Sequence, residues 1–282
     1  MSKAIQVAFQ GEQGAYSEQA IRAYFKSESI KTIPCVSFSD TLNCLANKKV
    51  TYAMLPIENS IAGSVVSAYD ALLKHNLRVH QEVILKVEHC LMANENADID
   101  DIERVRSHPQ ALAQCTNNLT RLDLSVLPFV DTAGAAKSIA ENRLLTEAAI
   151  AGELAAQTYG LKILLRNFED EPFNHTRFFL LGNITVAKAY QPDCYYKTSI
   201  VFATLDKPNA LVEILSCLSD REINMTKIES RPSRLKAWDC IFFLDFEGHE
   251  AQEKIQQALL EILKKSSYLK CLGSYCSSFF KL

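Results

Sequence analysis

Residues 78–92 read RVHQEVILKVEHCLM, a long extended stretch with few turn-forming residues. The stretch is either one long strand or a crossover between two lobes. A crossing here, with a return near residues 174–178, makes two α/β lobes with a cleft between them. Ligands of such folds bind outside the carboxyl ends of strands or between the lobes. This stretch therefore decides between a single sheet and a two-lobed fold.

Strand-like and helix-like segments alternate through roughly the first 190 residues. This alternation is typical of βα units and predicts α/β layers with a mostly parallel sheet. Ser17 and Thr132 are the expected caps of two of the helices. The expected strands are 5–9, 51–57, 105–107, 125–130, 148–151, 162–167 and 177–184, and the expected helices are one after the loop 11–14, 65–74, 109–122, 133–141 and one that ends at Gly160.

The pattern changes after a linker at residues 187–195, which has mixed polarity and includes Pro192. Beyond the linker the segments follow the order βαββαβ, which is the ferredoxin-like unit. The sequence thus predicts one domain at 1–188 and a second at 196–282. The expected segments of the second domain are strand 197–205, helix 210–221, strands 223–230 and 239–247, helix 251–265 and strand 268–275.

The chain has 282 residues, with 30 basic and 33 acidic side chains and a formal charge of −3. This balance predicts no electrostatic capture of nucleic acid or of a membrane surface. No apolar run approaches the roughly 18 residues of a membrane helix, and the N-terminus does not read as a secretion signal. The nine cysteines include no CxxC pair, and neither Cys271 with Cys276 nor His89 with Cys90 has zinc-site spacing. We expect reduced thiols, no metal and a cytoplasmic location.

Four polar, small-residue segments fall at junctions between expected strands and helices. Each places hydroxyl or amide groups at a helix N-terminus or a strand end, where backbone N–H groups favour anions. One such segment alone is more typical of a cap or a turn, but four on one scaffold predict a cleft for a small, multiply charged acid. Arg177 is a candidate for a forked contact with a carboxylate, or else a strand arginine paired at the surface. The segments are Pro56–Gly63, Ser107–Gln110, Asp131–Gly134 and Asn174–Arg177.

The same segments, slightly extended, resemble the prephenate dehydratase family. Its members carry Ile-Glu-Asn-Ser followed by Gly, then Ser-His-Pro-Gln-Ala-Leu-x-Gln-Cys, Asp-Thr-Ala-x-Ala-Ala and Asn-x-Thr-Arg-Phe. The chain matches them in this order with Ile57–Ser60 and Gly63, Ser107–Cys115, Asp131–Ala136 and Asn174–Phe178. The resemblance covers nearly the whole chain and implies two lobes similar to type II periplasmic-binding-protein architecture.

The resemblance implies a decarboxylating dehydration in L-phenylalanine biosynthesis, in which prephenate loses carbon dioxide and its ring hydroxyl and becomes phenylpyruvate. No cofactor or metal is implied, because aromatisation drives the reaction and the ring carboxylate supplies the electrons. The difficult step is the departure of hydroxide. A site must donate a hydrogen bond or a proton to that oxygen while it holds two carboxylates in position.

The resemblance also gives roles to individual residues. Thr176 is implied as the key donor, acting as an oriented hydroxyl because a threonine is a weak acid. His108 and His175 flank two motifs and are candidates for general acids, although flanking histidines more often serve packing or hydrogen bonding. Glu58 either contacts substrate or only orients its loop. The resemblance places Ser107, Asn59 and Gln114 beside Thr176 in the catalytic group. It places four residues in the substrate-binding group, which are Glu58, Thr132, Arg177 and Phe178.

The C-terminal segment resembles an ACT domain, a small regulatory fold that binds amino acids at interfaces between domains. The family usually has a glycine where this chain has Asn209, which tolerates left-handed geometry but places a side chain near the ligand. The resemblance implies L-phenylalanine as an allosteric inhibitor and a homodimer or homotetramer. The implied ligand-binding residues are Asn209, Ala210, Leu211 and Val212 with Glu229, Ser230, Arg231 and Pro232.

Three other functions stay open, and one of them is a purely regulatory protein with an inactive cleft, against which the presence of all the polar groups of the motifs argues. Arogenate dehydratases perform the same chemistry on the amino analogue of prephenate, and the sequence does not separate the two substrates. A small-acid binding module without catalysis is the third, because two-lobed α/β clefts also form solute-binding proteins. The N-terminal residues, which do not read as a secretion signal, and the Thr-Arg-Phe set argue against that module.

Overall fold

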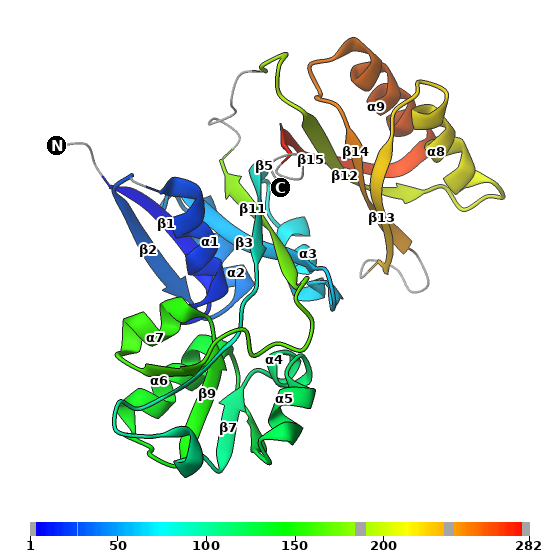
Figure 1. Ribbon diagram of the computed structural model, residues 1–282. Helices are drawn as coiled ribbons and strands as arrows, with labels where there is room; N and C mark the ends of the chain where they lie inside the picture. The colour runs from blue at the N-terminus through cyan, green and yellow to red at the C-terminus, as the bar shows by residue number, and fades with distance from the viewer. Residues whose placement is uncertain (1–3, 27, 184–189, 234–239, 278–282) are drawn as a thin grey trace. The chain divides into compact units, whose positions relative to one another are not determined.

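The computed structural model describes residues 4–26, 28–183, 190–233 and 240–277 (Figure 1). The chain forms two compact units. The cleft unit contains residues 1–76 and 83–180, and the C-terminal unit contains residues 77–82 and 181–282. A short segment of the N-terminal half thus belongs to the C-terminal unit, which nothing in the sequence patterns indicates.

The first lobe of the cleft unit is a sheet in the order β2-β1-β3-β11-β5, with β4 paired to β3. Strand β1 pairs with β2 and β3 in parallel, as expected for βα units. Phe9, Met54 and Phe178 from three strands are buried with Ile21 of helix α1, and burial of each such side chain contributes about 1.5–3 kcal/mol. The elements are β1 (Ile5–Gln10), α1 (Tyr16–Phe25), β2 (Ile30–Cys35), α2 (Phe38–Ala46), β3 (Tyr52–Asn59), β4 (Gly63–Ser64), α3 (Val66–Leu73), β5 (Arg78–Lys86) and β11 (His175–Gly182).

The second lobe is a sheet in the order β10-β6-β9-β7-β8. Strand β7 is parallel to β8 and β9, but β6 is antiparallel to β9 and β10, so this sheet is mixed where a mostly parallel sheet was expected. Strand β6 continues directly from the first lobe, so no crossover helix sets its direction. The elements are β6 (Cys90–Ala93), η1 (Ile99–Asp101), β7 (Arg104–Ser107), α4 (Pro109–Ala113), α5 (Thr116–Arg121), β8 (Ser125–Pro128), α6 (Thr132–Glu141), β9 (Glu147–Ala151), α7 (Glu153–Tyr159) and β10 (Lys162–Leu165).

The stretch 78–92 is a crossover. It forms β5 and β6, which belong to different sheets, and the chain returns to the first sheet at β11. Two backbone hydrogen bonds tie the connecting segments together, from Val87 N to Asn174 O and from Phe168 N to His89 O, both 2.8 Å. The two-lobed architecture predicted from the sequence is therefore confirmed.

The expected helix 109–122 is two helices, α4 and α5, with Gln114 at the end of the first. The carboxylate of Asp170 accepts the backbone N–H groups of Asn117 and Asn118 at 3.0 and 3.3 Å and so caps a new helix start. The backbone N–H of Asp170 in turn donates to Gln114 O at 2.7 Å. The break holds Gln114 at a fixed point of the second lobe.

Two helix starts also differ from the expected caps. Helix α6 is capped by Asp131, whose Oδ1 accepts a backbone N–H at 2.6 Å, and Thr132 is the first helical residue. Helix α1 follows Ala15, and Ser17 lies in its first turn. In addition, residues 30–46, for which the sequence indicated no element, form β2 and α2.

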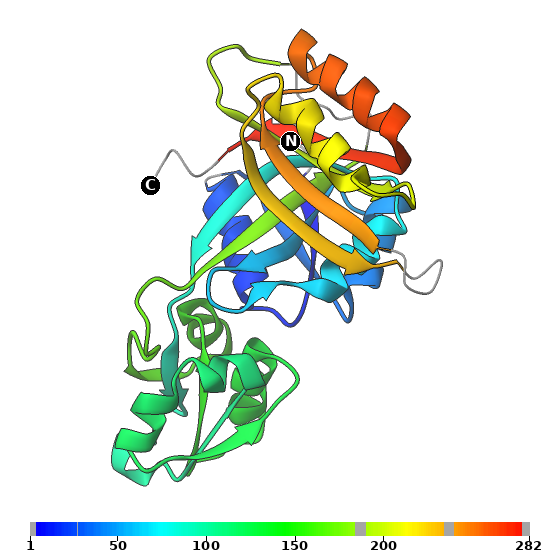
Figure 2. The same ribbon diagram turned by 90° about the vertical axis from the view of Figure 1, so that its right-hand side faces the viewer.

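The C-terminal unit is an antiparallel sheet in the order β13-β14-β12-β15, with α8 and α9 on one face (Figure 2). This confirms the ferredoxin-like order. Alternate residues of β12, Ile200 and Phe202, are buried against the helices. An added Cβ on Gly273 would lie 2.8 Å from Val79 O, so glycine permits the close approach of segment 77–82. The elements are β12 (Tyr196–Thr204), α8 (Ala210–Ser219), β13 (Met225–Pro232), β14 (Cys240–Glu247), α9 (Glu253–Lys265) and β15 (Ser266–Cys276).

Candidate active site

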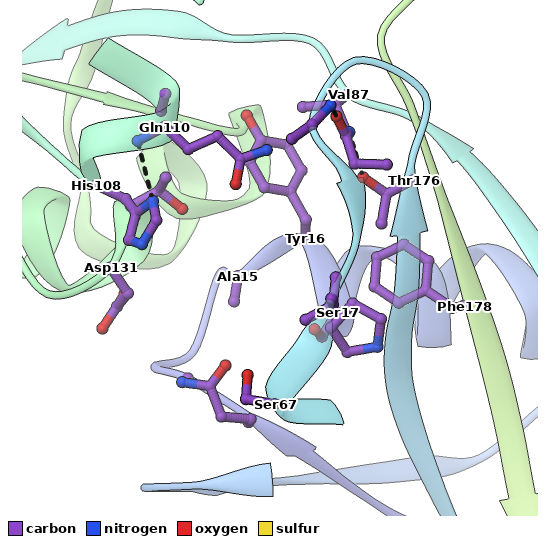
Figure 3. A pocket seen from close by; sticks show the side chains of 18 of the residues that line it. Ala15, Tyr16, Ser17, Ser67, Val87, His108, Gln110, Asp131, Thr176 and Phe178 are labelled. Carbon is purple, nitrogen blue, oxygen red and sulfur yellow. Dashed lines mark hydrogen bonds between the residues drawn. The ribbon is translucent and has the colours of Figure 1, made fainter. Parts of the chain in front are cut away.

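A cleft of about 570 Å³ lies between the two lobes of the cleft unit. Its walls come from the β1–α1 loop, β3, β11 and the start of α2 in the first lobe, and from the starts of α4 and α6 in the second. Val87 and His89 of the crossover also line it. Figure 3 shows Tyr16, His108 and Thr176 around this space.

Three carboxamide side chains form a hydrogen-bonded chain beside the cleft. The oxygen of Asn59 accepts the backbone N–H groups of Ile61 and Ala62 at 3.1 and 2.9 Å, so its NH₂ group points the other way. That NH₂ donates to Asn174 Oδ1 at 2.7 Å, and Asn174 Nδ2 donates to Gln114 Oε1 at 2.9 Å. Because backbone donors identify the first oxygen, the orientation of all three amides follows.

The Asn59 NH₂ also fixes the direction of the Thr176 hydroxyl. Asn59 Nδ2 lies 3.0 Å from Thr176 Oγ1 and must be the donor, because an amide nitrogen does not accept. In the described part of the chain nothing accepts the Thr176 proton, and the side chain lines the cleft (Figure 3). Thr176 is therefore an oriented donor available to a ligand of the cleft.

Gln114 presents a second unused donor. Its oxygen accepts from Asn174 and from His89 Nε2 at 3.0 Å, whereas its buried nitrogen has no hydrogen-bond partner among the described residues. Because Gln114 Oε1 only accepts, His89 carries a proton on Nε2. Burial lowers the pKa of His89 below its ordinary value, so the neutral ring leaves Nδ1 to accept from the Tyr16 hydroxyl at 2.7 Å.

The groups of the cleft that favour an anion are, among its described residues, helix N-termini and hydroxyl groups, and not cationic side chains. The first turns of α1 and α6 both line it, and each helix has ten residues. The N-terminus of such a helix favours an anion through its dipole and its unpaired N–H groups. The lining residues within the described ranges include no lysine or arginine. The groups that the cleft offers to a carboxylate are therefore backbone N–H groups and hydroxyls, and the Thr132 side chain is among its lining residues.

Some of the expected site residues lie outside the cleft lining. Ser107 is fully buried and donates to a backbone carbonyl at 2.6 Å. Arg177 neighbours Thr176 on β11 and therefore faces the opposite side of the strand. Its guanidinium lies 3.5 Å from Glu58 and 5.0 Å from the ring centre of Phe179. Direct contact of Ser107, Glu58 or Arg177 with substrate stays a prediction. The expected residues that do line the cleft are Asn59, Gln114, Thr132, Thr176 and Phe178.

The two candidate histidines take different positions. His108 lines the cleft, and its Nδ1 accepts the backbone N–H of Gln110 at 3.2 Å, so a neutral His108 carries its proton on Nε2. His175 lies outside the lining, with Nδ1 at 3.2 Å from Phe173 O. Of the two, His108 is the one placed to contact a ligand.

Sequence reasoning missed Tyr16, His89 and the part played by Asn174. Tyr16 and His89 belong to no motif, and their contact joins residues 73 positions apart, a pairing that no local spacing predicts. Asn174 opens the Asn-x-Thr-Arg-Phe segment, so its position in that motif was the available signal.

Across the described ranges, no group of three or more His, Cys, Asp or Glu side chains is arranged to hold a metal ion. All nine cysteines are free. In the part of the chain that the structure describes, no helix is both long and apolar enough to cross a membrane.

The two ACT-like segments lie at the same end of the C-terminal sheet. Ala203 near the end of β12 and Arg231 of β13 both pair with Ile241 of β14. Asn209 precedes α8 with a φ of 64°, the left-handed conformation that glycine adopts without strain, and its side chain makes no capping hydrogen bond. Glu229 lies 3.9 Å from Arg231.

Comparison with known proteins identifies the family. The family described as prephenate dehydratase (PDT) matches residues 7–185, more than half of the chain. The chain is a member of the prephenate dehydratase family. This member is 44% identical over 281 residues to arogenate dehydratase/prephenate dehydratase 2 of Arabidopsis thaliana, described as chloroplastic, with 96% of this chain and 72% of the relative covered.

Two solved structures share the fold of this prephenate dehydratase family member. Prephenate dehydratase from Arthrobacter aurescens in complex with L-Phe is 29% identical with a TM-score of 0.89, covering 97% of this chain and 90% of that one. GqqA, described as a novel type of quorum quenching acylase, is 34% identical with a TM-score of 0.89, covering 98% of this chain and 100% of that one. Relatives described by different activities share the architecture, so the fold alone does not determine the function.

Proposed function

We propose that the chain catalyses the decarboxylating dehydration of prephenate to phenylpyruvate, with release of carbon dioxide and water. The observation that carries the proposal is the Thr176 hydroxyl, whose oxygen accepts from Asn59 Nδ2 at 3.0 Å and whose proton is left for a ligand of the cleft. Membership of the family and the identity to a relative named for arogenate and prephenate dehydratase support the same reaction class.

The reaction needs a donor at the leaving oxygen. The bond between the ring and its carboxylate breaks, carbon dioxide leaves, and the freed electron pair completes the aromatic ring as the C–O bond breaks. The departing oxygen leaves as water, with the net proton supplied by solvent. Thr176 stabilises the charge that develops on this oxygen, and the NH₂ of Gln114 is a second donor to a substrate oxygen.

The substrate's two carboxylates must be held while the hydroxyl leaves. The lining without lysine or arginine and the start of α6 at Thr132 support a role for backbone N–H groups and the Thr132 hydroxyl. Arg177 and Glu58, which lie 3.5 Å apart on the other side of β11 and β3, hold the strand that carries Thr176.

Arogenate is the alternative substrate, because it has the same ring, carboxylate and leaving hydroxyl and differs in the side chain. The purified full-length chain should be assayed with each acid, with phenylpyruvate followed by ultraviolet absorbance and phenylalanine by chromatography. We expect phenylpyruvate from prephenate, with the larger kcat/KM. Turnover of arogenate alone would change the substrate and keep the reaction class, whereas turnover of neither acid would refute the proposed function.

The assay should be repeated after exhaustive chelation. The family resemblance implies no metal or cofactor, so turnover should persist. A loss of activity that a divalent cation restores would contradict this expectation.

We further propose that residues 1–188 are the catalytic domain and that residues 196–282 are an ACT domain through which L-phenylalanine inhibits. The convergence of the two ACT-like segments at one sheet end supports a ligand site there. The Arthrobacter aurescens structure in complex with L-Phe supports this choice of ligand. The Asn209 side chain stands where the family's glycine leaves space, so we expect weaker binding. A coupling of about 5–150-fold is typical of such regulation.

Calorimetric and kinetic titrations of the full-length chain with L-phenylalanine test this proposal. Asn209→Gly should bind L-phenylalanine more tightly than the wild type, because glycine adopts a φ of 64° freely and removes the side chain. Glu222→Gly is the matched control, since Glu222 also has a positive φ of 53° in the same unit but lies outside both segments. Purely competitive inhibition against prephenate would instead place L-phenylalanine in the cleft.

We also propose a homodimer or homotetramer, because ACT ligand sites lie between domains, and a reducing, cytoplasmic location, which nine free cysteines support. Sedimentation of the full-length chain with and without L-phenylalanine tests the first point. A monomer under both conditions would contradict it.

A further inference from the structure

Tyr16 and His89 connect the first lobe and the crossover to Gln114 of the second lobe. Tyr16 begins α1, His89 lies at the end of the crossover, and Gln114 ends α4. Tyr16 Oη lies 2.7 Å from His89 Nδ1, and His89 Nε2 lies 3.0 Å from Gln114 Oε1. The two rings meet edge to face with centroids 5.6 Å apart. An added Cβ on Gly152 would lie 2.9 Å from Tyr16 Cε1, so glycine makes room for the ring.

A neutral His89 ring has one proton, and these two contacts decide which nitrogen carries it. Gln114 Oε1 only accepts, so Nε2 carries the proton and Nδ1 accepts from the Tyr16 hydroxyl. Without that hydroxyl, nothing on the Nδ1 side favours this tautomer. In the other tautomer the Nε2 lone pair faces Gln114 Oε1, and the repulsion turns or displaces the amide.

We propose that Tyr16 and His89 are a positioning pair that fixes the Gln114 carboxamide with its NH₂ directed at the substrate. The inference rests on the proposed function, in which that NH₂ donates to a substrate oxygen. Its position matters because the nitrogen is buried and has no partner elsewhere in the described chain. An amide that turned over would present its oxygen to an anionic substrate and lose the donor.

Protonation of His89 preserves the contact to Gln114. A protonated ring donates from both nitrogens, and the Tyr16 hydroxyl then turns to Glu88 O at 3.1 Å. The Nε2 proton faces Gln114 in both states. Loss of the Tyr16 hydroxyl should therefore weaken turnover most while His89 is neutral, and the difference should shrink only as pH falls through the folded pKa of His89, which burial holds below its ordinary value.

Two carboxyl groups and two thiols are the other titratable groups near His89. Glu169 Oε2 accepts the His89 backbone N–H at 2.7 Å, and Glu88 is its chain neighbour. Burial raises the pKa of Cys90 to about 11 and raises that of Cys115 further, so both thiols stay protonated below neutral pH. A purely structural role of the Tyr16 hydroxyl would give a loss that does not follow this pH range.

A double-mutant cycle on the full-length chain tests the pair, with kcat/KM measured on the acid that the wild type turns over. Tyr16→Phe should lower kcat/KM about tenfold when Gln114 is present and less than about twofold in the Gln114→Ala background. Tyr159→Phe is the matched control, because its hydroxyl also contacts a backbone oxygen of the opposite lobe, Gln13 O at 2.8 Å, without reaching Gln114. Equal losses in the two backgrounds, or the same loss in Tyr159→Phe, would overturn the proposal.

Nitrogen NMR of the histidine-labelled full-length chain is a second measurement that needs no turnover. The His89 signals are assigned by their loss in His89→Gln. We expect a protonated Nε2 and an unprotonated Nδ1 at neutral pH, and a mixture of tautomers in Tyr16→Phe. A proton on Nδ1 in the wild type would overturn the positioning pair. Turnover of neither acid together with the expected tautomer would refute the proposed function and confirm the arrangement on which the pair depends.

Discussion

The polar network beside the cleft and the polar network on the C-terminal sheet differ in where their hydrogen bonds end. The cleft network runs from Asn59 to Gln114 and stops at a carboxamide nitrogen without a partner in the described chain. Asn59 Nδ2 also donates to the Thr176 oxygen, and the Thr176 hydroxyl proton has no acceptor in the described chain.

The network of the C-terminal unit closes on itself. Ser199 donates to Asp245 Oδ1 at 2.5 Å, and the Tyr275 hydroxyl lies 2.5 Å from the same serine oxygen. Beside it, the buried Glu82 lies 3.4 Å from Lys197 Nζ. Each of these groups has a charged or hydrogen-bonding partner of the same unit.

An unpaired buried donor costs about 1–3 kcal/mol, so the buried nitrogen of Gln114, which has no partner among the described residues, lowers the stability of the fold at the cleft. In the C-terminal network the buried groups are paired with each other, and these partners offset the cost of burying charge. The two networks thus differ in whether a donor is left without a partner among the described residues. This difference predicts that isosteric substitutions will have opposite consequences in the two networks.

The largest effect is expected from Glu82→Gln. Glu82 is fully buried, and the substitution leaves the Lys197 ammonium without this counter-charge, which should cost about 3–5 kcal/mol of unfolding free energy. Denaturant unfolding of the full-length chain measures the loss. Glu153→Gln is the control, because it removes an exposed pair with Arg166 and should leave the stability unchanged. Similar losses in both variants would remove the contrast between buried and exposed pairs.

Thr176→Val should have the next largest effect, and it should act on turnover. The side chain keeps its shape and loses the donor, so kcat should fall by about 10²-fold or more, or about 2.7 kcal/mol, with little change in KM. Steady-state kinetics measure this, with Thr32→Val as a strand threonine outside the cleft. A fall in kcat of less than about fivefold would show that another cleft group, such as His108, is the key donor.

Gln114→Glu replaces a carboxamide by a carboxylate, which is the reverse of the substitution at Glu82. The oxygen that accepts from Asn174 and His89 is kept, while a carboxylate oxygen replaces the free NH₂ in front of an anionic substrate. We expect kcat/KM to fall about 30-fold, or about 2 kcal/mol. The loss of turnover should exceed the loss of stability measured by unfolding. The opposite ranking would mean that Gln114 serves the fold more than the ligand.

The smallest effect concerns the pH dependence of stability. The pKa of His89 in the folded protein lies below its unfolded value of about 6.5, so the unfolded chain binds more protons between the two values. The His89 contribution is thus fully present above pH 6.5 and is lost as pH falls toward the folded pKa, by at most about 1.4 kcal/mol per pH unit. The free energy of unfolding should be measured at several pH values between about 5.5 and 7.5. It should change less with pH in His89→Gln than in the wild type, and equal pH dependence in the two proteins would contradict this.

Much of the cleft is predictable from sequence because its motifs end strands or begin helices. Asn59, Gln114 and Thr176 come from three motifs and meet in the structure. The direction of their amides is not predictable, since it depends on backbone donors that only the folded loop after Asn59 supplies. Strand periodicity alone could have separated Arg177 from Thr176, because neighbours along a strand face opposite sides.

The remaining differences come from contacts that are distant in the chain. The break after Gln114 depends on Asp170, which caps the second helix from a position 53 residues beyond Asn117. Local helix propensity carries no sign of such a cap. The sharing of residues 77–82 with the C-terminal unit has a similar origin, because the strands that they contact lie more than a hundred residues later.

The position of β11 between β3 and β5 bears on how the chain is completed during synthesis. The second lobe, residues 90–165, is contiguous and can assemble as it emerges from the ribosome. The first lobe must wait, because the strand that fills its sheet is translated only after the entire second lobe. Until then β3 and β5 have open edges that are exposed to wrong pairing, including pairing with each other. Translation of β11 closes that gap and leads directly into the chain of the C-terminal unit.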